Sequence, residues 1–194
     1  MPMYTGDLSF FAGNCSHRFA ADVVCAVSVN VRAMWSVGVA YCDLKTTNIL
    51  YRRKGDVFYA VLGDLGSIVP RRSHDGSYKA GIFTFPPQRA MDGIVVPIEA
   101  DLVWGLGALL LTLMHGTAWV SDRLTGDALR MRCDDDISTA FSAASAEIRA
   151  VADEMRAMHG GSGVRIADAL EIAIAAWNGA KEGTLRKFCA AIRG

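Results

Sequence analysis

Residues 41–50 read YCDLKTTNIL, and they set an acidic, a basic and an amide side chain immediately before an apolar run. The three polar side chains are those of Asp43, Lys45 and Asn48. A second apolar run, VFYAVL at 57–62, follows the letters RRKGD, and GDLG then supplies Asp64. Two short apolar runs around a Gly-containing turn predict a β-hairpin. The hairpin therefore connects the first polar group with a further acid.

The sequence on both sides of this hairpin has helical patterning. Apolar residues recur at helical spacing over 19–37 and stop before Gly38, which suits the end of a helix. The predicted fold class is mainly α with a small β-hairpin, an α+β arrangement. We expect further helices near 101–114, 137–158, 165–177 and 182–192, a loop from 115, and a long polar loop over 67–89.

The composition limits the classes of partner. The 194 residues suit one domain with a sizeable core, and 20 Lys and Arg balance 20 Asp and Glu. A chain without net charge has no global attraction to nucleic acid or to an anionic membrane, so neither partner is expected. Five scattered cysteines form no C-x-x-C pair, and the amino terminus lacks the layout of a signal peptide. We therefore expect an intracellular protein, in the cytoplasm or the nucleus.

One segment, VWGLGALLLTLMHGTAWV at 103–120, contains no Asp, Glu, Lys or Arg. Its length allows either a membrane-spanning helix or the central helix of a globular domain. The segment is interrupted by glycines, and its flanking residues Asp101 and Asp122 are acidic rather than basic. These features favour a buried interior helix.

The order of the features resembles the large lobe of a eukaryotic-type protein kinase. In that family a helix leads to H-R-D-L-K-x-x-N, and a hairpin then leads to D-F-G. The matching letters here are YCDLKTTN at 41–48 and DLG at 64–66. Downstream, GIFTFPPQ at 81–88 resembles the end of an activation segment, ADLVWGLGALLLTLMHG at 100–116 the central helix, and GVRIADAL at 163–170 the start of the last helix.

This resemblance covers nearly the whole chain, so residues 1–194 are expected to form one protein-kinase-like large lobe. The matched parts are the hinge and first helix start at 1–12, the catalytic loop and metal-binding turn at 41–66, the activation segment at 67–89 and the helical subdomain at 100–194.

The resemblance implies a chemical role for each matched polar residue. Phosphoryl transfer depends on positioning and on neutralising the charge of the phosphate oxygens. Asp43 would orient or accept the proton of the attacking hydroxyl, and Lys45 would contact the transferred phosphate. Asn48 and Asp64 would bind Mg²⁺ and the ATP phosphates through oxygen, the ligand atom that this cation prefers.

The remaining implied residues concern the nucleotide and the substrate. Leu50 would form the floor of the adenine pocket of ATP, and Gly63 would keep that pocket open. Lys45 also favours Ser or Thr over Tyr as the acceptor, so a protein substrate with hydroxyl side chains is expected.

The chain also departs from the family. The Gly-rich loop, strand lysine and helix glutamate of the kinase small lobe have no counterpart in it. We therefore expect weak ATP binding by the isolated chain unless a partner supplies the missing N-lobe. Two alternatives follow: a catalytically inactive pseudokinase that acts as a binding module, and a small-molecule phosphotransferase of the aminoglycoside type, which shares an Asp, Asn and Asp arrangement.

Overall fold

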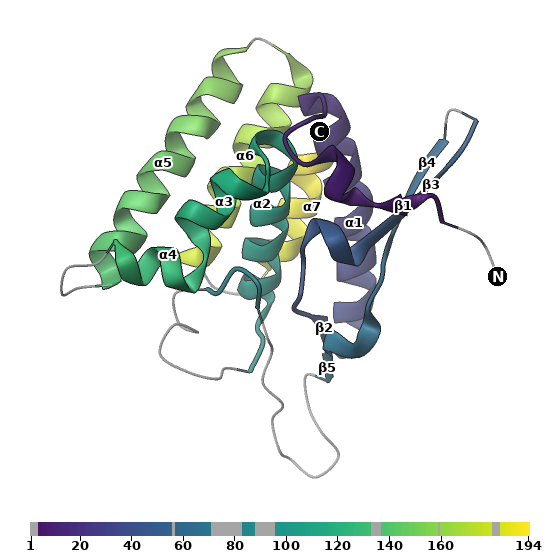
Figure 1. Cartoon of the computed structure of the whole chain (residues 1–194), viewed down its shortest axis with the longest axis horizontal. Coiled ribbons are helices and arrows are strands. Elements are labelled where there is room, and N and C mark those ends of the chain that lie inside the picture. The colour runs from purple at the N-terminus through teal and green to yellow at the C-terminus, as the bar shows by residue number, and fades with distance from the viewer. Residues whose placement is uncertain are drawn as a thin grey trace.

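The computed structural model describes residues 4–55, 57–70, 83–87, 96–132, 137–158, 160–179 and 183–194. It consists of a helical body with two small antiparallel sheets at one side (Figure 1). The α-helices are α1 His17–Ser36, α2 Glu99–His115, α3 Thr117–Leu124, α4 Gly126–Met131, α5 Ile137–Ala157, α6 Gly161–Trp177 and α7 Thr184–Arg193. The strands are β1 Gly6–Asp7, β2 Val39–Tyr41, β3 Ile49–Lys54, β4 Val57–Leu62 and β5 Ile68–Pro70. This confirms a mainly helical α+β fold.

Helix α1 begins and ends at residues whose chemistry favours a helix boundary. The Ser16 hydroxyl accepts a hydrogen bond from the amide of Phe19 at 3.2 Å, which satisfies one of the free amides of the first turn. After the last turn, Gly38 adopts φ 82°, a conformation that other residues take up only with strain. The helix predicted for 19–37 is confirmed, and it starts two residues earlier.

Helix α2 forms the centre of the body, as its apolar sequence predicted. Its residues from Ala100 to Met114 are all buried. The Trp104 indole stacks on that of Trp177 in α6, with ring centroids 4.0 Å apart. Within the part of the chain that the structure describes, no helix is both long and apolar enough to cross a bilayer.

The chain after α2 differs from the predicted loop. Gly116 has φ 92°, which ends α2, and α3 begins at the next residue. Thr125 then accepts a hydrogen bond from the amide of Ala128 through its hydroxyl, which caps α4. Both helices are too short to give a clear helical repeat in the sequence, so the prediction of a loop was wrong here.

The helices predicted near 137–158, 165–177 and 182–192 are present as α5, α6 and α7. The segment at 163–170 lies inside α6. Helix α7 follows α6, so within this chain the segment belongs to the helix before the last, and its resemblance to a kinase element stays a prediction.

The predicted hairpin is present as β3 and β4. The two strands pair from Ile49 opposite Leu62 to Lys54 opposite Val57, so the turn is shorter than the letters RRKGD suggested. Strand β1 adds to the other edge of β3. Of the long loop predicted over 67–89, residues 68–70 form strand β5 and 83–87 have no regular structure, whereas 71–82 and 88–89 lie outside the described residues.

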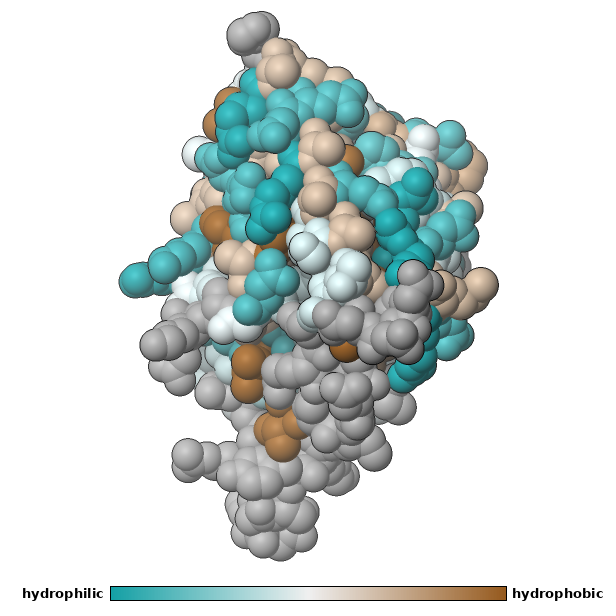
Figure 2. Space-filling model, turned by 90° about the vertical axis from the view of Figure 1, so that its left-hand side faces the viewer, coloured by the Kyte–Doolittle hydropathy of each residue, from teal (hydrophilic) through white to brown (hydrophobic). Residues whose placement is uncertain are grey.

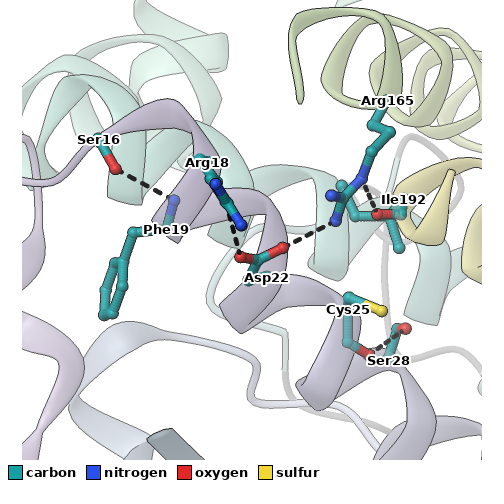
Figure 3. A network of polar contacts seen from close by, with 8 residues as sticks. All are labelled: Ser16, Arg18, Phe19, Asp22, Cys25, Ser28, Arg165 and Ile192. Carbon is teal, nitrogen blue, oxygen red and sulfur yellow. Dashed lines mark hydrogen bonds and ion pairs between the residues drawn. The ribbon is translucent and has the colours of Figure 1, made fainter. Parts of the chain in front are cut away.

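A polar network ties α1, α6 and α7 together near their ends (Figure 3). The guanidinium of Arg165 in α6 donates to the backbone carbonyl of Ile192 in α7 at 2.7 Å and to the carboxylate of Asp22 in α1 at 3.0 Å. Arg18 contributes a second, longer ion pair to Asp22 at 3.9 Å. One arginine therefore joins three helices that are distant in sequence.

The side of the molecule on which α5 and α4 lie is shown in Figure 2. Hydrophilic and intermediate residues dominate the described part of this face, and strongly hydrophobic residues are few. Between the helices, Glu147 of α5 bonds both Arg123 of α3 and Arg132 after α4. This side is therefore held by ion pairs at the surface above an apolar interior.

Candidate functional site

The structure brings the two polar segments of the hairpin region together through a second, smaller sheet. Strand β2 precedes the loop at 42–48, strand β5 follows the turn at 63–67, and the two strands pair antiparallel. The Tyr41 hydroxyl donates to the carbonyl of Gly63 at 2.7 Å, and the Gly63 amide donates to the carbonyl of Asn48 at 2.7 Å. One side-chain contact and one backbone contact thus fasten the turn to β2 and to the end of the loop.

The carboxylate of Asp43 lies at the centre of the site and accepts bonds from three side chains. Its Oδ2 lies 2.7 Å from Nζ of Lys45 and accepts from the Asn48 amide nitrogen at 2.8 Å. The same nitrogen lies 3.2 Å from the Asp43 carbonyl oxygen, which closes the loop on itself. The other carboxylate oxygen, Oδ1, accepts a hydrogen bond from the hydroxyl of Thr84.

These contacts set the ionisation of Asp43. Burial raises the pKa of the carboxyl, but the hydrogen bonds from Lys45, Thr84 and Asn48 and the charge of Lys45 outweigh it. The pKa therefore lies below its usual value, and the group is a carboxylate at neutral pH. A carboxylate held in this way can accept a hydrogen bond or a proton from a hydroxyl close to it.

The loop at 42–48 packs against helix α2 through Leu44. Leu44 is buried, and a methyl group added at Gly105 of α2 would meet its Cδ1 at 3.0 Å. Glycine at 105 therefore allows the loop to approach the helix closely. Nearby, Asp101 accepts from the Ile98 amide at 2.8 Å at the start of α2.

Two residues beside Asp43 are held in their neutral forms. Burial, followed by the charges of Asp101 and Asp43, raises the pKa of the Cys42 thiol to about 12. Burial and the charge of Asp43 likewise raise the pKa of Tyr41 to about 12. The phenol therefore keeps its proton and remains a donor to Gly63, and the thiol is not a reactive nucleophile at neutral pH.

The Asp64 turn has an unusual backbone conformation. Asp64 adopts φ 41° and ψ 66°, and it is the only residue other than glycine with positive φ in the described part of the chain. Its carboxylate is exposed and makes no hydrogen bond or ion pair with any other described residue. A strained acidic residue with an unengaged carboxylate is a reasonable candidate for a ligand-binding group.

Gly63 and Leu50 lie against each other. A methyl group at Gly63 would meet Cγ of Leu50 and the carbonyl oxygen of Asn48, both at 3.2 Å. The glycine thus permits the close packing of the turn on β3. Leu50 is half-buried on the face of the sheet that Asp7 shares.

Thr84 is the member of the site to which the sequence interpretation gave no role. It lies in the short described segment 83–87, where Phe85 is buried and the carbonyl of Pro86 accepts from Nε1 of Trp177 at 3.3 Å. These contacts hold the segment against the helical body. A hydroxyl residue two positions before a pair of prolines was visible in the sequence, but no local pattern indicates that it meets an acid 41 positions away.

The side-chain oxygens of Asn48 and Asp64 suit a hard divalent cation in part. Asn48 donates to Asp43 through its amide nitrogen, so its side-chain oxygen is the atom suited to a cation, and the Asp64 carboxylate bonds none of the other described residues. The described residues contain no cluster of three or more His, Cys, Asp or Glu that could hold a metal alone. Mg²⁺ usually takes only one or two protein carboxylates and completes its shell with water and phosphate oxygens. The residue types therefore suit magnesium better than zinc.

Comparison with known proteins gives partial support for a kinase relationship. No family model matches the chain. Over 104 residues the chain is 31% identical to the ribosomal protein S6 kinase alpha-2 of Homo sapiens, a match that covers 52% of this chain. The match spans only 14% of that kinase. The chain is thus similar to part of a protein kinase.

Proposed function

We propose that the chain is a Ser/Thr protein kinase-like catalytic lobe, which transfers the γ-phosphate of ATP to hydroxyl groups of a protein substrate. The observation that carries the proposal is the Asp43 carboxylate, held by Lys45 and Asn48 in a loop that is fastened to the Asp64 turn. The partial similarity to a protein kinase supports the same class of reaction.

Each residue has a distinct task in this proposal. Asp43 orients the attacking hydroxyl and accepts its proton, because its lowered pKa keeps it ionised. Lys45, 2.7 Å from that carboxylate, places a positive charge beside the phosphate in transfer. Asn48 and Asp64 would hold Mg²⁺, which when bound neutralises the charge of the phosphate oxygens.

Leu50 and Gly63 would form the floor under the adenine. Leu50 lies on the same sheet as β1, directly opposite Asp7, so this floor is continuous with the amino-terminal strand. The Asp64 turn is exposed, and charge interactions are weak in contact with water. We therefore propose that efficient transfer requires a second lobe, supplied by a partner, that covers the nucleotide.

A pseudokinase that serves as a binding module is the second candidate. The observation that favours it is the exposure of the Asp64 turn, including Leu65, which is 58% exposed. In this alternative the loop geometry is kept for its shape, and no phosphate is transferred.

Thermal unfolding with ATP, measured with and without Mg²⁺, tests the nucleotide site first. A ligand at 100 times its dissociation constant stabilises a protein by about 2.7 kcal/mol. For a chain of this size, saturation of that degree would raise the midpoint by roughly 5–10 °C, and the weaker binding expected of the isolated chain would raise it by less. The rise should need Mg²⁺ and should disappear in Asp64→Asn. No rise at millimolar ATP with either form would contradict a nucleotide site in the isolated chain.

Phosphate transfer to dephosphorylated casein tests the reaction. Asp43→Asn should lower the rate by at least about 100-fold, because it removes the base while preserving the shape of the side chain. ATP binding without any transfer, in wild type as in Asp43→Asn, would favour the binding module. Transfer to kanamycin but not to casein would favour a small-molecule phosphotransferase.

A further inference from the structure

The outer face of the hairpin sheet carries side chains that the candidate site does not use. Successive residues of a strand point to opposite faces, so the register places Arg52 and Lys54 of β3 on one face with Val57 and Tyr59 of β4. Arg52 pairs across the strands with Tyr59, and Lys54 with Val57. The face therefore has a basic row beside an apolar row.

The opposite face of the same sheet is already occupied. Tyr51 and Phe58 stack there with centroids 5.4 Å apart, and they meet Phe11 and Phe19 in an aromatic cluster under α1. The Asn30 amide nitrogen of α1 also donates to the Ala60 carbonyl at 3.3 Å. The outer edge of β4 is thus partly closed by α1, which disfavours the addition of a further strand.

The outer face remains exposed among the described residues. Val57 is 52% and Tyr59 40% exposed, and the guanidinium of Arg52 lies 4.9 Å from the centroid of the Tyr59 ring. Neither Arg52 nor Lys54 forms an ion pair with another residue that the structure describes. In Figure 1 the hairpin projects beyond the helical body, so this face is accessible from outside.

We propose that this outer sheet face, made of Arg52, Lys54, Val57 and Tyr59, binds a short segment of a partner protein that carries acidic and apolar side chains. The two cations are two residues apart on one strand, so they lie roughly 7 Å from each other. Acidic residues at alternate positions of an extended segment have the same spacing. The residues between them point to the other side of the segment, where apolar side chains would cover Val57 and Tyr59. Charge complementarity would select the partner, and burial of the apolar row would hold it.

The number of cations argues against other anionic partners. Stable attraction to an anionic membrane takes a cluster of about 4–8 basic residues near the surface. Affinity for nucleic acid rises with the number of phosphates that basic residues neutralise. The outer face offers two cations on a chain whose formal net charge is zero. A protein segment that also uses the apolar row fits this face better. Leu50 lies on this same face, two residues before Arg52, so the segment would bind beside the proposed adenine floor, but the inference does not require that ATP binds there.

Fluorescence anisotropy with a labelled peptide of sequence Gly-Glu-Leu-Asp-Val-Glu-Phe-Gly, titrated with the whole chain, tests the proposal. We expect saturable binding that weakens as salt rises, and no binding of the peptide with Lys in place of each acid. The double variant Arg52→Glu and Lys54→Glu should weaken binding at least about tenfold. The matched control, Arg149→Glu with Arg186→Glu, changes the net charge equally at exposed positions on α5 and α7.

The variant Val57→Ser with Tyr59→Ser separates the apolar row from the charge, and it should also weaken binding. Thermal unfolding of each variant confirms that it is folded. No saturable binding by wild type, or an equal loss in the Arg149 and Arg186 control, would overturn the proposal. It would also be overturned if oligothymidine or phosphatidylserine vesicles bound in place of the peptide and lost binding in the Arg52 and Lys54 variant.

Discussion

At the scale of single residues, the Asp43 carboxylate is the group on which the candidate site depends. It is surrounded by donors from its own loop, Lys45 and Asn48, and by one distant donor, Thr84. Each of these stabilises the ionised form, whereas burial favours the neutral form. The balance can be shifted by removing one donor at a time.

Replacing Thr84 by Val should raise the pKa of Asp43, because the variant keeps the shape of the side chain but loses the hydroxyl that donates to Oδ1. Thr84→Ser keeps the hydroxyl and should leave the pKa closer to that of wild type. The carboxyl carbon of Asp43, followed by NMR during an acid titration, reports the change directly. An identical titration curve in Val and Ser variants would show that Thr84 has no influence on the carboxylate.

The same shift has a consequence for stability. Because the pKa of Asp43 is lower in the folded protein than its ordinary value of 3.8, its ionised form stabilises the fold above that pH. The stabilisation is lost as the pH falls further, through the pKa of the folded protein. Thr84→Val, with a smaller shift, should lose less stability over this acidic range.

The sequence predicted this site in part. Asp43, Lys45 and Asn48 lie within one loop, so spacing alone places them close together, and their mutual contacts in the structure agree with that. Thr84 could not be found in this way, because its contact with Asp43 depends on how segment 83–87 packs on Trp177. The reason that position 63 needs glycine is the approach of Leu50, which is likewise a tertiary contact.

At the scale of elements, the packing of α2 against α6 depends on a close approach at one glycine. A methyl group at Gly107 would lie 2.5 Å from Cβ of Ala173, so the two helices would have to move apart. Gly161, in the first turn of α6, has no atom within 4 Å of such a methyl group. The two positions make a matched pair, because both glycines lie within helices.

Alanine is favoured over glycine in the middle of a helix by about 0.5–1 kcal/mol, so Gly161→Ala, at the first residue of α6, should stabilise the protein by at most this amount. Gly107→Ala gains the same preference but overpacks the core, which costs about 1–3 kcal/mol. We therefore expect a net loss of up to about 2 kcal/mol for Gly107→Ala. Urea unfolding of both variants measures the difference. Equal stability of the two would contradict the close contact between α2 and α6.

Helices and strands with several apolar periods, or with a clear turn or end signal in the sequence, were predicted correctly. The shortest helices and strands were not. The hairpin and helices α1, α2, α5, α6 and α7 have clear apolar periods or end signals in the sequence. Helices α3 and α4 have eight and six residues, so neither completes a recognisable repeat. Strand β5 has three residues and exists only because it pairs with β2.

At the scale of the whole molecule, Arg165 holds helices that are far apart in sequence. It joins Asp22, 143 positions away, and the carbonyl of Ile192. No local pattern predicts such a contact, which appears only once the helices are packed.

Arg165→Ala should lower the stability, because the buried part of the guanidinium satisfies the Ile192 carbonyl. Hydrogen bonds to charged groups contribute about 1.5–3 kcal/mol. The pair with Asp22 adds little, since Asp22 is 54% exposed and surface ion pairs contribute about 0–1 kcal/mol. Asp22→Asn should therefore cost less than Arg165→Ala in urea unfolding. The reverse order would show that the ion pair, and not the carbonyl contact, holds the three helices.

The stability of the whole fold should also depend on His115, at the carboxyl end of α2. Its ring stacks on Trp119 with centroids 4.8 Å apart, and its Nε2 is buried without a hydrogen-bond partner among the described residues. Burial lowers the pKa of His115 from its ordinary value of 6.5. The charges of His17 in α1 and Arg123 in α3 act in the same direction, and Glu154 in α5 opposes them.

A histidine with a lowered pKa binds its proton more weakly in the folded than in the unfolded chain. The unfolded chain therefore takes up more protons as the pH falls below about 6.5, and the free energy of unfolding decreases. Stability should be lower at pH 5.5 than at pH 7.5 in urea unfolding. His115→Phe keeps the ring against Trp119, and His115→Gln keeps a polar side chain, but neither takes up a proton in this range. Both variants should therefore lose less stability between the two pH values than wild type does. If both lose as much as wild type, another group causes the acid sensitivity.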